Sequence, residues 1–247
     1  MRVVIFSGTT EGRTLACALA GMGAQVCVCV ATEYGQEEQP VEPGIEIRTG
    51  RLQEMEMAAL LRGNDLCIDA THPYATQATA NIKQAALAAG VPYHRLLRQP
   101  SVLPESSVIV SDAAGAADFL AGQPGNILLT TGAKELSAFA ALETKRLYPR
   151  VLPAQTSLAA CEAAGIPHRN IIAMQGPFSR RLNEAILEQF GIRFLVTKDG
   201  GAAGGFAEKA AACAVRGVTL VVIRRPEETG ETMDGILQLC REMMECM

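Results

Sequence analysis

The chain contains no tryptophan, and only 4% of its 247 residues are aromatic. A composition this poor in aromatic side chains suits the packed layers of an α/β fold better than a β-sandwich. Apolar residues make up 49% of the sequence, which is enough to build a substantial core. Because domains usually hold about 100–200 residues, the length fits one large domain or two small ones.

Long runs of basic residues and long runs of apolar residues are also missing. No block of about five basic residues occurs and the net charge is -4, so the sequence does not favour a nucleic-acid-binding protein. No stretch approaches the roughly 18 consecutive apolar residues of a membrane span, and the start, MRVVIFSGTTEG, does not resemble a signal peptide. We therefore expect a cytoplasmic protein with neither nucleic acid nor membrane as a partner.

The sequence offers no pattern that would bind a metal. It has no CxxC pair, and its three histidines, His72, His94 and His168, show no paired spacing. Eight cysteines are scattered along the chain. We expect them to be small buried apolar side chains in a reducing compartment, and we predict no metal site.

Short apolar runs alternate with helical patterns along the chain. Residues 2–6, 25–30 and 66–70 are typical of buried strands, and residues 74–89 form an Ala-rich helical pattern that Gly90 would end. The last helical pattern carries one apolar face, made of Met233, Ile236, Leu237, Cys240, Met243, Met244 and Met247. This alternation predicts parallel sheets with helices on both faces, an α/β fold.

A break in the pattern divides the chain. Residues 98–106 contain Pro100 and Pro104 and lack periodicity, which is typical of a domain boundary. The number of strands then favours two doubly wound parallel-sheet domains, residues 1–100 and residues 101–247. A (β/α)8 barrel is the alternative, but the break in mid-chain and the uneven units disfavour it.

Residues that can carry chemistry follow several of the predicted strands. In parallel α/β folds this is the edge at which ligands bind. In the first half, residues 7–12 open the first helix with small residues that let a phosphate approach, although the full GxGxxG pattern is absent and a plain tight turn remains the alternative. Arg51 follows the strand at residues 45–48 and is either a partner for a ribose 2′-phosphate or a solvated surface arginine.

Titratable side chains crowd the end of the strand at residues 66–70, where the sequence reads DATHPYA. His72 there is either a proton donor or a structural histidine. In the second half, residues 198–205 place four glycines next to Lys198, which indicates a loop around an anionic ligand, with a flexible connector as the alternative. Similar strand-end loops occur at residues 130–135 and 175–179.

These motifs together resemble a known family. SGTTEGR, ATEYG, DATHPYA, TTGAKEL, MQGPFS, TKDGGAAGG and IRRP match the precorrin-6A and cobalt-precorrin-6A reductases in order and spacing, from residue 2 to about residue 226. The family commonly has Ser or Asn-Ser where this chain has Gly200, which puts a hydroxyl contact to ligand in doubt at that position. The resemblance implies two Rossmann-like domains that can exchange a strand, with the active site in the cleft between them.

The resemblance also implies an activity. It is the reduction, by NADPH or alternatively NADH, of one macrocycle double bond of a tetrapyrrole substrate during cobalamin biosynthesis, with transient contacts to neighbouring pathway enzymes. Another NAD(P)-binding Rossmann-like enzyme and a non-catalytic tetrapyrrole carrier are the alternatives.

We predict three sets of site residues from these loops. The cofactor would be bound by Ser7, Gly8, Thr9, Thr10, Glu11, Gly12, Arg51 and Thr71. The substrate would be bound by Gly132, Lys134, Gln175, Ser179, Lys198 and Gly201. The proton that accompanies the hydride would come from solvent or from Asp69, His72, Tyr74 or Asp199.

Overall fold

The computed structural model describes residues 1–39, 41–201 and 204–246. It divides into two compact units. Unit 1 is made of Met1–Arg98 and Pro226–Met247, and unit 2 is made of Gln99–Arg225.

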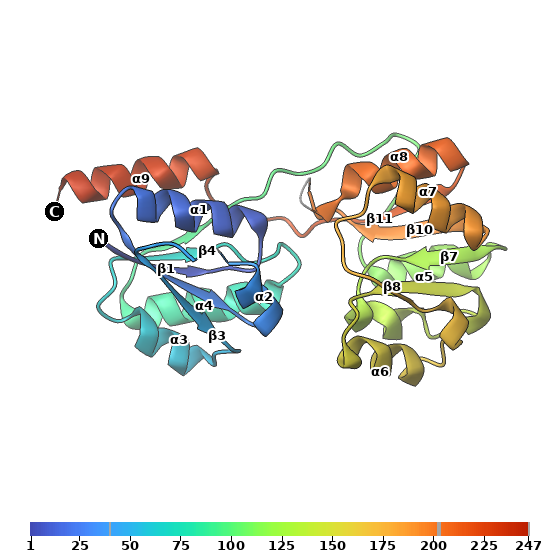
Figure 1. Ribbon diagram of the computed structural model, residues 1–247, viewed down its shortest axis with the longest axis horizontal. Coiled ribbons are helices and arrows are strands. Elements are labelled where there is room, and N and C mark those ends of the chain that lie inside the picture. Colours follow the sequence, from blue (N-terminus) through green and yellow to red (C-terminus); the bar gives the residue numbers. More distant parts are fainter. Residues whose placement is uncertain (40, 202–203, 247) are drawn as a thin grey trace. The chain divides into compact units, whose positions relative to one another are not determined.

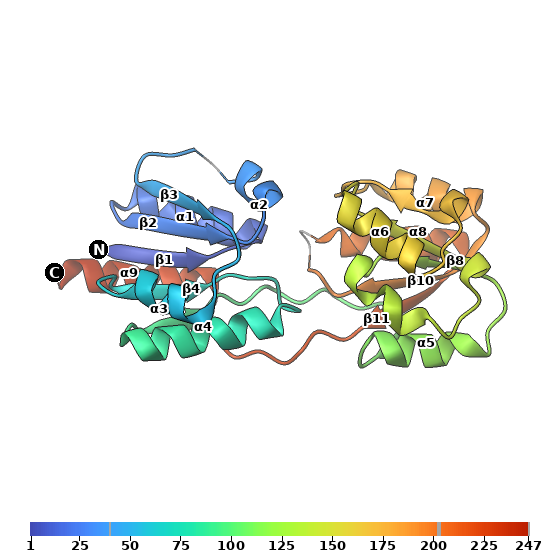
Figure 2. The same ribbon diagram turned by 90° about the horizontal axis from the view of Figure 1, so that it is seen from below.

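Unit 1 is a five-stranded parallel sheet in the order β3-β2-β1-β4-β5, and the first four of these strands follow one another in Figure 2. Its strands are β1 (Arg2–Phe6), β2 (Gln25–Val30), β3 (Ile45–Thr49), β4 (Leu66–Asp69) and β5 (Tyr93–Arg95). Its helices are α1 (Thr10–Gly21), α2 (Glu33–Glu37), α3 (Glu54–Leu61), α4 (Thr76–Ala89) and α9 (Met233–Glu245). This strand order is that of dinucleotide-binding α/β domains.

The alternation of side chains along β1 builds two cores, one on each face of this sheet. Val3 and Ile5 pack with Leu15 of α1 on one face, whereas Val4 packs with Leu61 of α3 and Ile82 of α4 on the other. Because successive side chains of a strand point to opposite faces, a continuous apolar run is what a sheet covered on both faces requires.

Unit 2 is a six-stranded parallel sheet in the order β6-β11-β10-β7-β8-β9. Its strands are β6 (Val108–Val110), β7 (Asn126–Leu129), β8 (Leu147–Val151), β9 (Ile172–Ala173), β10 (Ile192–Lys198) and β11 (Thr219–Ile223). Its α-helices are α5 (Ala113–Ala121), α6 (Gln155–Ala163), α7 (Arg180–Gln189) and α8 (Phe206–Arg216). Within its described residues, unit 2 also has the 3₁₀ helices η1 (Ala133–Phe139), η2 (Thr144–Arg146) and η3 (His168–Asn170). Figure 1 shows α7 and α8 on one side of this sheet and α6 on the other.

The predicted fold class, α/β with two doubly wound parallel sheets, is confirmed, and two separate sheets exclude the (β/α)8 barrel. Gly90 ends α4 with φ of 68°, as predicted. The short elements α2, β6 and α5 were not predicted, and the helix expected over residues 134–142 is the 3₁₀ helix η1. Within the described residues, no helix is both long and apolar enough to cross a membrane.

The C-terminal segment corrects the predicted domain division. We expected residues 101–247 to form the second domain, but Pro226–Met247 belongs to unit 1. The reason is the apolar face of α9, because Ile236 and Cys240 are fully buried in the core that contains Leu15 and Leu19 of α1. Figure 1 shows α9, in red, beside α1, in blue. The segment forms a helix, and among the described residues its strand-like pairing is a bridge between Leu96 and Glu231.

Candidate active site

The carboxyl ends of β1 and β4 form the edge at which the predicted cofactor residues gather. β1 lies between β2 and β4, so the chain leaves β1 toward one side of the sheet and reaches β4 on the other. Open α/β sheets bind ligands at this kind of switch point, because the loops on either side diverge and leave a crevice. Residues 7–12 follow β1 there, and residues 70–74 follow β4.

The loop between β1 and α1 has the shape of a phosphate cradle. Gly8 has φ of +153°, and a Cβ atom on it would have no neighbour within 4 Å, so the backbone is open at this point. The Thr9 hydroxyl accepts a hydrogen bond from the Gly12 N–H (3.0 Å) and donates one to the Ala70 carbonyl (2.9 Å). Since the first N–H groups of a helix have no intrahelical partner, those of Thr10 and Glu11 remain available for an anion.

Gly12 lets α1 approach the sheet closely. A Cβ atom at this position would lie 2.5 Å from Ser7 Oγ and 3.0 Å from the Cβ atom of Ala70. Ser7 Oγ is itself buried, and no hydrogen-bond partner is found for it among the described residues. The loop therefore fits the pyrophosphate of a dinucleotide, with an open glycine, exposed helix N–H groups and a close helix–strand contact.

Glu11 and Arg51, two of the predicted cofactor residues, differ in how far other side chains engage them. Glu11 pairs with Arg98 (Oε2 to Nη2, 2.5 Å), so its carboxylate already has a cationic partner. Arg51 is exposed just beyond β3, next to Gly50, whose N–H donates to the carbonyl of Val30 at the end of β2 (2.9 Å). Arg51 thus lies beside the end of β2.

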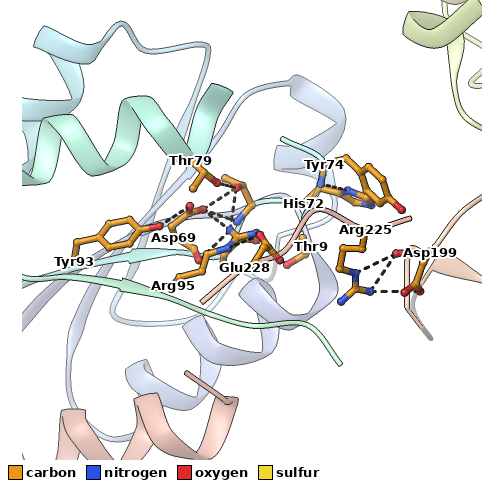
Figure 3. A network of polar contacts seen from close by, with 12 residues as sticks. Thr9, Asp69, His72, Tyr74, Thr79, Tyr93, Arg95, Asp199, Arg225 and Glu228 are labelled. Carbon is orange, nitrogen blue, oxygen red and sulfur yellow. Dashed lines mark hydrogen bonds and ion pairs between the residues drawn. The ribbon is translucent and has the colours of Figure 1, made fainter. Parts of the chain in front are cut away.

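Asp69, the last residue of β4, is the centre of a buried polar network (Figure 3). Its side chain has no exposed surface. Oδ1 accepts from Arg95 Nη1 (2.7 Å), from the Thr71 N–H (3.0 Å) and from the Thr71 hydroxyl (2.7 Å). Oδ2 accepts from the Tyr93 hydroxyl (3.0 Å). An ion pair of this kind holds the turn after β4 in place, which is a positioning role.

The partners of Asp69 are themselves fixed. Arg95 is 3% exposed and also binds Glu228 Oε1 through Nε (3.0 Å) and Nη2 (2.6 Å). Burial, together with the charge of Asp69, raises the pKa of the Tyr93 phenol, so Tyr93 stays protonated and donates to Asp69. A pocket of about 620 Å³ opens beside this network, and it is lined by Pro73, Thr76, Thr79, Lys83, Arg95 and residues 226–229.

His72 and Tyr74 lie in the turn that this network positions. His72 Nδ1 accepts a hydrogen bond from the Tyr74 N–H (3.3 Å), and the two rings are 5.6 Å apart (Figure 3). Both side chains are partly exposed, whereas Asp69 is buried. Of the titratable groups predicted in this loop, these two are therefore the ones that a ligand can reach.

The predicted residues of unit 2 also lie at the carboxyl ends of its strands. Lys198, at the end of β10, pairs with Glu135 of η1 (2.6 Å). Asp199 is buried, and its Oδ1 accepts from the Ser101 N–H (3.2 Å) and the Gly201 N–H (3.2 Å) and lies 3.5 Å from Arg225 Nη2. These contacts fix Asp199 as a link between three backbone segments of unit 2.

The remaining predicted substrate residues lie in or beside the loops that follow strands of unit 2. Gly132, Lys134 and Gln175 are exposed, and Gly132 has φ of +89°. Ser179 is the N-cap of α7, and its hydroxyl accepts from the Leu182 N–H (3.3 Å). Gly201 is buried. Ala202 and Ala203 of the predicted glycine-rich loop lie outside the described residues.

Comparison with known proteins decides the family. The family model described as precorrin-6x reductase CbiJ/CobK matches residues 2–241. The chain belongs to this family. It is 32% identical to the cobalt-precorrin-6A reductase of Methanothermobacter thermautotrophicus, over 98% of this chain and 86% of that protein. It is 34% identical to the cobalt-precorrin-6A reductase of Salmonella typhimurium, over 91% and 87%, and 32% identical to the precorrin-6A reductase of Rhodococcus erythropolis, over 95% and 94%.

A solved structure of this family shares the fold. The chain superposes on a CobK precorrin-6A reductase with a TM-score of 0.77, at 24% identity, over 98% of this chain and 96% of that one. The predicted family, and with it an oxidoreductase of cobalamin biosynthesis, is confirmed. A reductase of this family requires a nicotinamide cofactor. Within the described part of the chain, no cluster of three or more His, Cys, Asp or Glu side chains is arranged to bind a metal ion.

Sequence reasoning missed several residues of this reductase that the structure brings together. Glu228 binds Arg95 across 133 positions of sequence, so no local pattern links them. Asn183 and Lys209 are buried in unit 2 and were not predicted as site residues. The sequence could have indicated Lys209, because it lies on the face of α8 that carries Phe206, Ala212 and Cys213, where an apolar residue is expected.

Proposed function

We propose that this protein uses NADPH to reduce one double bond of the macrocycle in precorrin-6A or its cobalt complex. The observation that carries this proposal is the open Gly8 loop at the switch point of a β3-β2-β1-β4-β5 sheet, next to the partly exposed His72 and Tyr74. The bound cofactor supplies the hydride. The side chains of the chain orient the two ligands and handle the proton.

Unit 1 is the proposed cofactor domain. The N–H groups of Thr10 and Glu11 face the pyrophosphate, Gly8 allows its approach, and Thr71 lies on the opposite side of the switch point. NADPH is favoured over NADH because the first two residues after β2, Ala31 and Thr32, carry no carboxylate that would repel a 2′-phosphate, and Glu33 already belongs to α2. Arg51 lies beside this strand end and would pair with the phosphate.

The proton donor in this proposal is His72. Asp69 and Asp199 are buried and engaged by arginines and backbone N–H groups, so they position loops. Histidine is the side chain that ordinarily changes charge near neutral pH, and His72 is partly exposed at the edge where the cofactor would bind. Replacing it with asparagine would lower kcat more than it raises KM, and a variant with unchanged turnover would leave Tyr74 or solvent as the source.

Unit 2 is the part of the chain that we propose binds the macrocycle. Its strand ends carry Lys134 and Lys198, cations that suit the carboxylate side chains of a tetrapyrrole, and Gly132, Gln175, Ser179 and Gly201 lie in the same set of loops. A biosynthetic reductase that draws on NADPH also fits the cytoplasm and brief contacts with the enzymes before and after it in the pathway.

The test is the absorbance of reduced nicotinamide under anaerobic conditions. Precorrin-6A and its cobalt complex are each incubated with NADPH and with NADH. Both macrocycles are included because relatives named for each are 32% identical to this chain. We expect oxidation of NADPH with one macrocycle at least. No oxidation in any of the four mixtures, with protein that is folded by circular dichroism, would favour a tetrapyrrole carrier.

A further inference from the structure

The carboxyl end of β8 holds an arginine that is buried among neutral groups. Arg150 is 7% exposed, and its guanidinium carbon lies 4.1 Å from the centre of the Phe178 ring. Its Nη1 donates to Asn183 Oδ1 (2.8 Å). Asn183 is fully buried and donates in turn to the carbonyls of Phe178 (3.3 Å) and Ser179 (3.0 Å). Arg150 is therefore fixed in orientation by a ring and an amide, and neither carries a charge.

A second buried cation comes from α8. Lys209 is 8% exposed and lies on the helix face that also buries Phe206, Ala212 and Cys213. Phe206 and Cys213 belong to the core that packs α8 against the sheet of unit 2. In the part of the chain that the structure describes, no hydrogen bond or ion pair is found for the Lys209 ammonium.

Three effects act against a charge on Lys209. The first is burial and the second is the positive charge of Arg150. Both lower the pKa of Lys209, which is about 8 even though the neighbouring Glu208 raises it. Burial likewise lowers the pKa of Arg150 to about 10. The third is position, because Lys209 is the fourth residue of α8, near the positive end of the helix dipole. A buried cation with no ion-pair partner is unfavourable, and an anion bound here would offset that cost.

We propose that Arg150 and Lys209 form a binding site for an oxyanion, either a carboxylate or a phosphate, between β8, α7 and α8. The planar guanidinium can donate two parallel hydrogen bonds to such a group, and the ammonium adds a point charge. In the working enzyme a carboxylate ligand would be a side chain of the macrocycle, which unit 2 is proposed to bind, and the two probes below distinguish it from a phosphate. The proposal does not depend on which reaction the enzyme catalyses, so its failure would leave the reductase assignment standing.

The experiment uses the full chain and two small probes. Sulfate stands for a phosphate and propionate for a carboxylate, because the charge of each is constant above pH 7. The melting temperature is measured against either probe, with chloride keeping the ionic strength constant. We expect at least one probe to raise the melting temperature of the wild type, and the stronger one identifies the source of the natural ligand. If neither probe raises it above the chloride control, the proposal is overturned.

Matched variants assign the effect to Lys209. In Lys209→Met the apparent Kd for the stronger probe should rise about tenfold or more, while the melting temperature without probe should increase. Lys145→Met makes the same change at an exposed position of η2 and should leave both quantities as in the wild type. Equal responses to the probe in the wild type and in Lys209→Met would overturn the proposal.

A second measurement covers the case in which Lys209→Met does not fold. The stabilisation of the wild type by sulfate should fall between pH 7 and pH 9, because Lys209 loses its proton in this interval. The interval ends below the pKa of Arg150, about 10, so Arg150 keeps most of its charge within it. A sulfate effect that is constant over the interval would contradict a role for Lys209.

Discussion

At the scale of single residues, Asp69 is the centre of a buried network of charges and hydrogen bonds. Its carboxylate is fully buried and accepts hydrogen bonds from Arg95, Thr71 and Tyr93. Asp69→Asn keeps the shape of the side chain but removes the charge that faces Arg95. We expect the free energy of unfolding to fall by about 3 kcal/mol, because a buried cation loses one of its two carboxylate partners. Urea denaturation measures this.

Asp118→Asn is the control for this change, since Asp118 is exposed on α5 and its replacement should leave the free energy of unfolding unchanged. A proton donor would behave differently from a positioning residue. If Asp69→Asn lowers kcat strongly while the free energy of unfolding stays at the wild-type value, Asp69 takes part in the chemistry.

Lys209 should make the stability of the ligand-free protein depend on pH. Its pKa is about 8 in the folded protein and near 10.5 when unfolded, so between these values the unfolded chain binds the proton and the folded chain does not. Stability therefore rises with pH through this window. Below pH 8 the folded protein carries the full cost of the buried charge, on the order of 3 kcal/mol. Lys209→Met should be more stable than the wild type at pH 7, and the difference should disappear near pH 10.5 in urea titrations.

Arg51 decides cofactor preference in the proposed function. It is exposed beside the end of β2, where a ribose 2′-phosphate would lie. Arg51→Ala should raise KM for NADPH about tenfold, the effect of losing one charge-assisted contact, and should leave KM for NADH unchanged. Arg62→Ala, at an exposed position just after α3, serves as the control. Equal changes for both cofactors would remove Arg51 from the 2′-phosphate site.

At the scale of elements, the contact between α1 and β4 depends on Gly12. A methyl group there would lie 2.5 Å from Ser7 Oγ and 3.0 Å from the Cβ atom of Ala70, so α1 would have to move away from the sheet. We expect Gly12→Ala to lower the free energy of unfolding by about 1–3 kcal/mol and to raise KM for the cofactor, because the helix N-terminus shifts. Steady-state kinetics and urea denaturation check the two effects.

Gly21→Ala makes the same change at the other end of α1, where an added Cβ would meet no atom within 4 Å. Since alanine favours a helix more than glycine does, this variant should be as stable as the wild type or more stable. If Gly12→Ala is as stable as Gly21→Ala and leaves KM for the cofactor unchanged, the close contact with β4 does not fix the position of α1.

The elements that could be predicted from the sequence are those with a strong periodic pattern. β1 and β2 have the predicted bounds because each is an apolar run between turn residues. β6 has three residues and α2 has five, and elements this short lack enough residues to show a period. β6 is held by its pairing with β11, which is more than 100 positions away in sequence. Its existence is decided by tertiary contacts.

The same limit applies to the candidate site. The strand-end loops could be predicted because a parallel sheet brings the carboxyl ends of its strands to one edge. Which side chains are engaged there could not be predicted, since Arg95 reaches Asp69 and Glu228 from distant parts of the chain. Lys209 was readable in principle, as a charged residue in the buried row of an amphipathic helix.

At the scale of the whole molecule, the C-terminal segment ties the end of the chain to its beginning. Ile236 of α9 is fully buried in the core that contains Leu15, Leu19 and β1, although more than 200 positions separate them. Ile236→Ala should lower the free energy of unfolding by about 2–5 kcal/mol through the cavity it leaves. Val215→Ala, at a mostly exposed position of α8, is the control and should have little effect.

Hydrogen exchange followed by mass spectrometry shows which part of the chain is destabilised in Ile236→Ala. Because α9 completes unit 1, the amides of β1 and α1 should lose protection, while those of Gln99–Arg225 should keep it. A division of the chain at residue 100 makes the opposite prediction, since α9 would then stabilise the second domain. Loss of protection in β10 and β11 with β1 unaffected would therefore restore the continuous domains suggested by the sequence, and loss in β1 alone would establish that unit 1 is built from both ends of the chain.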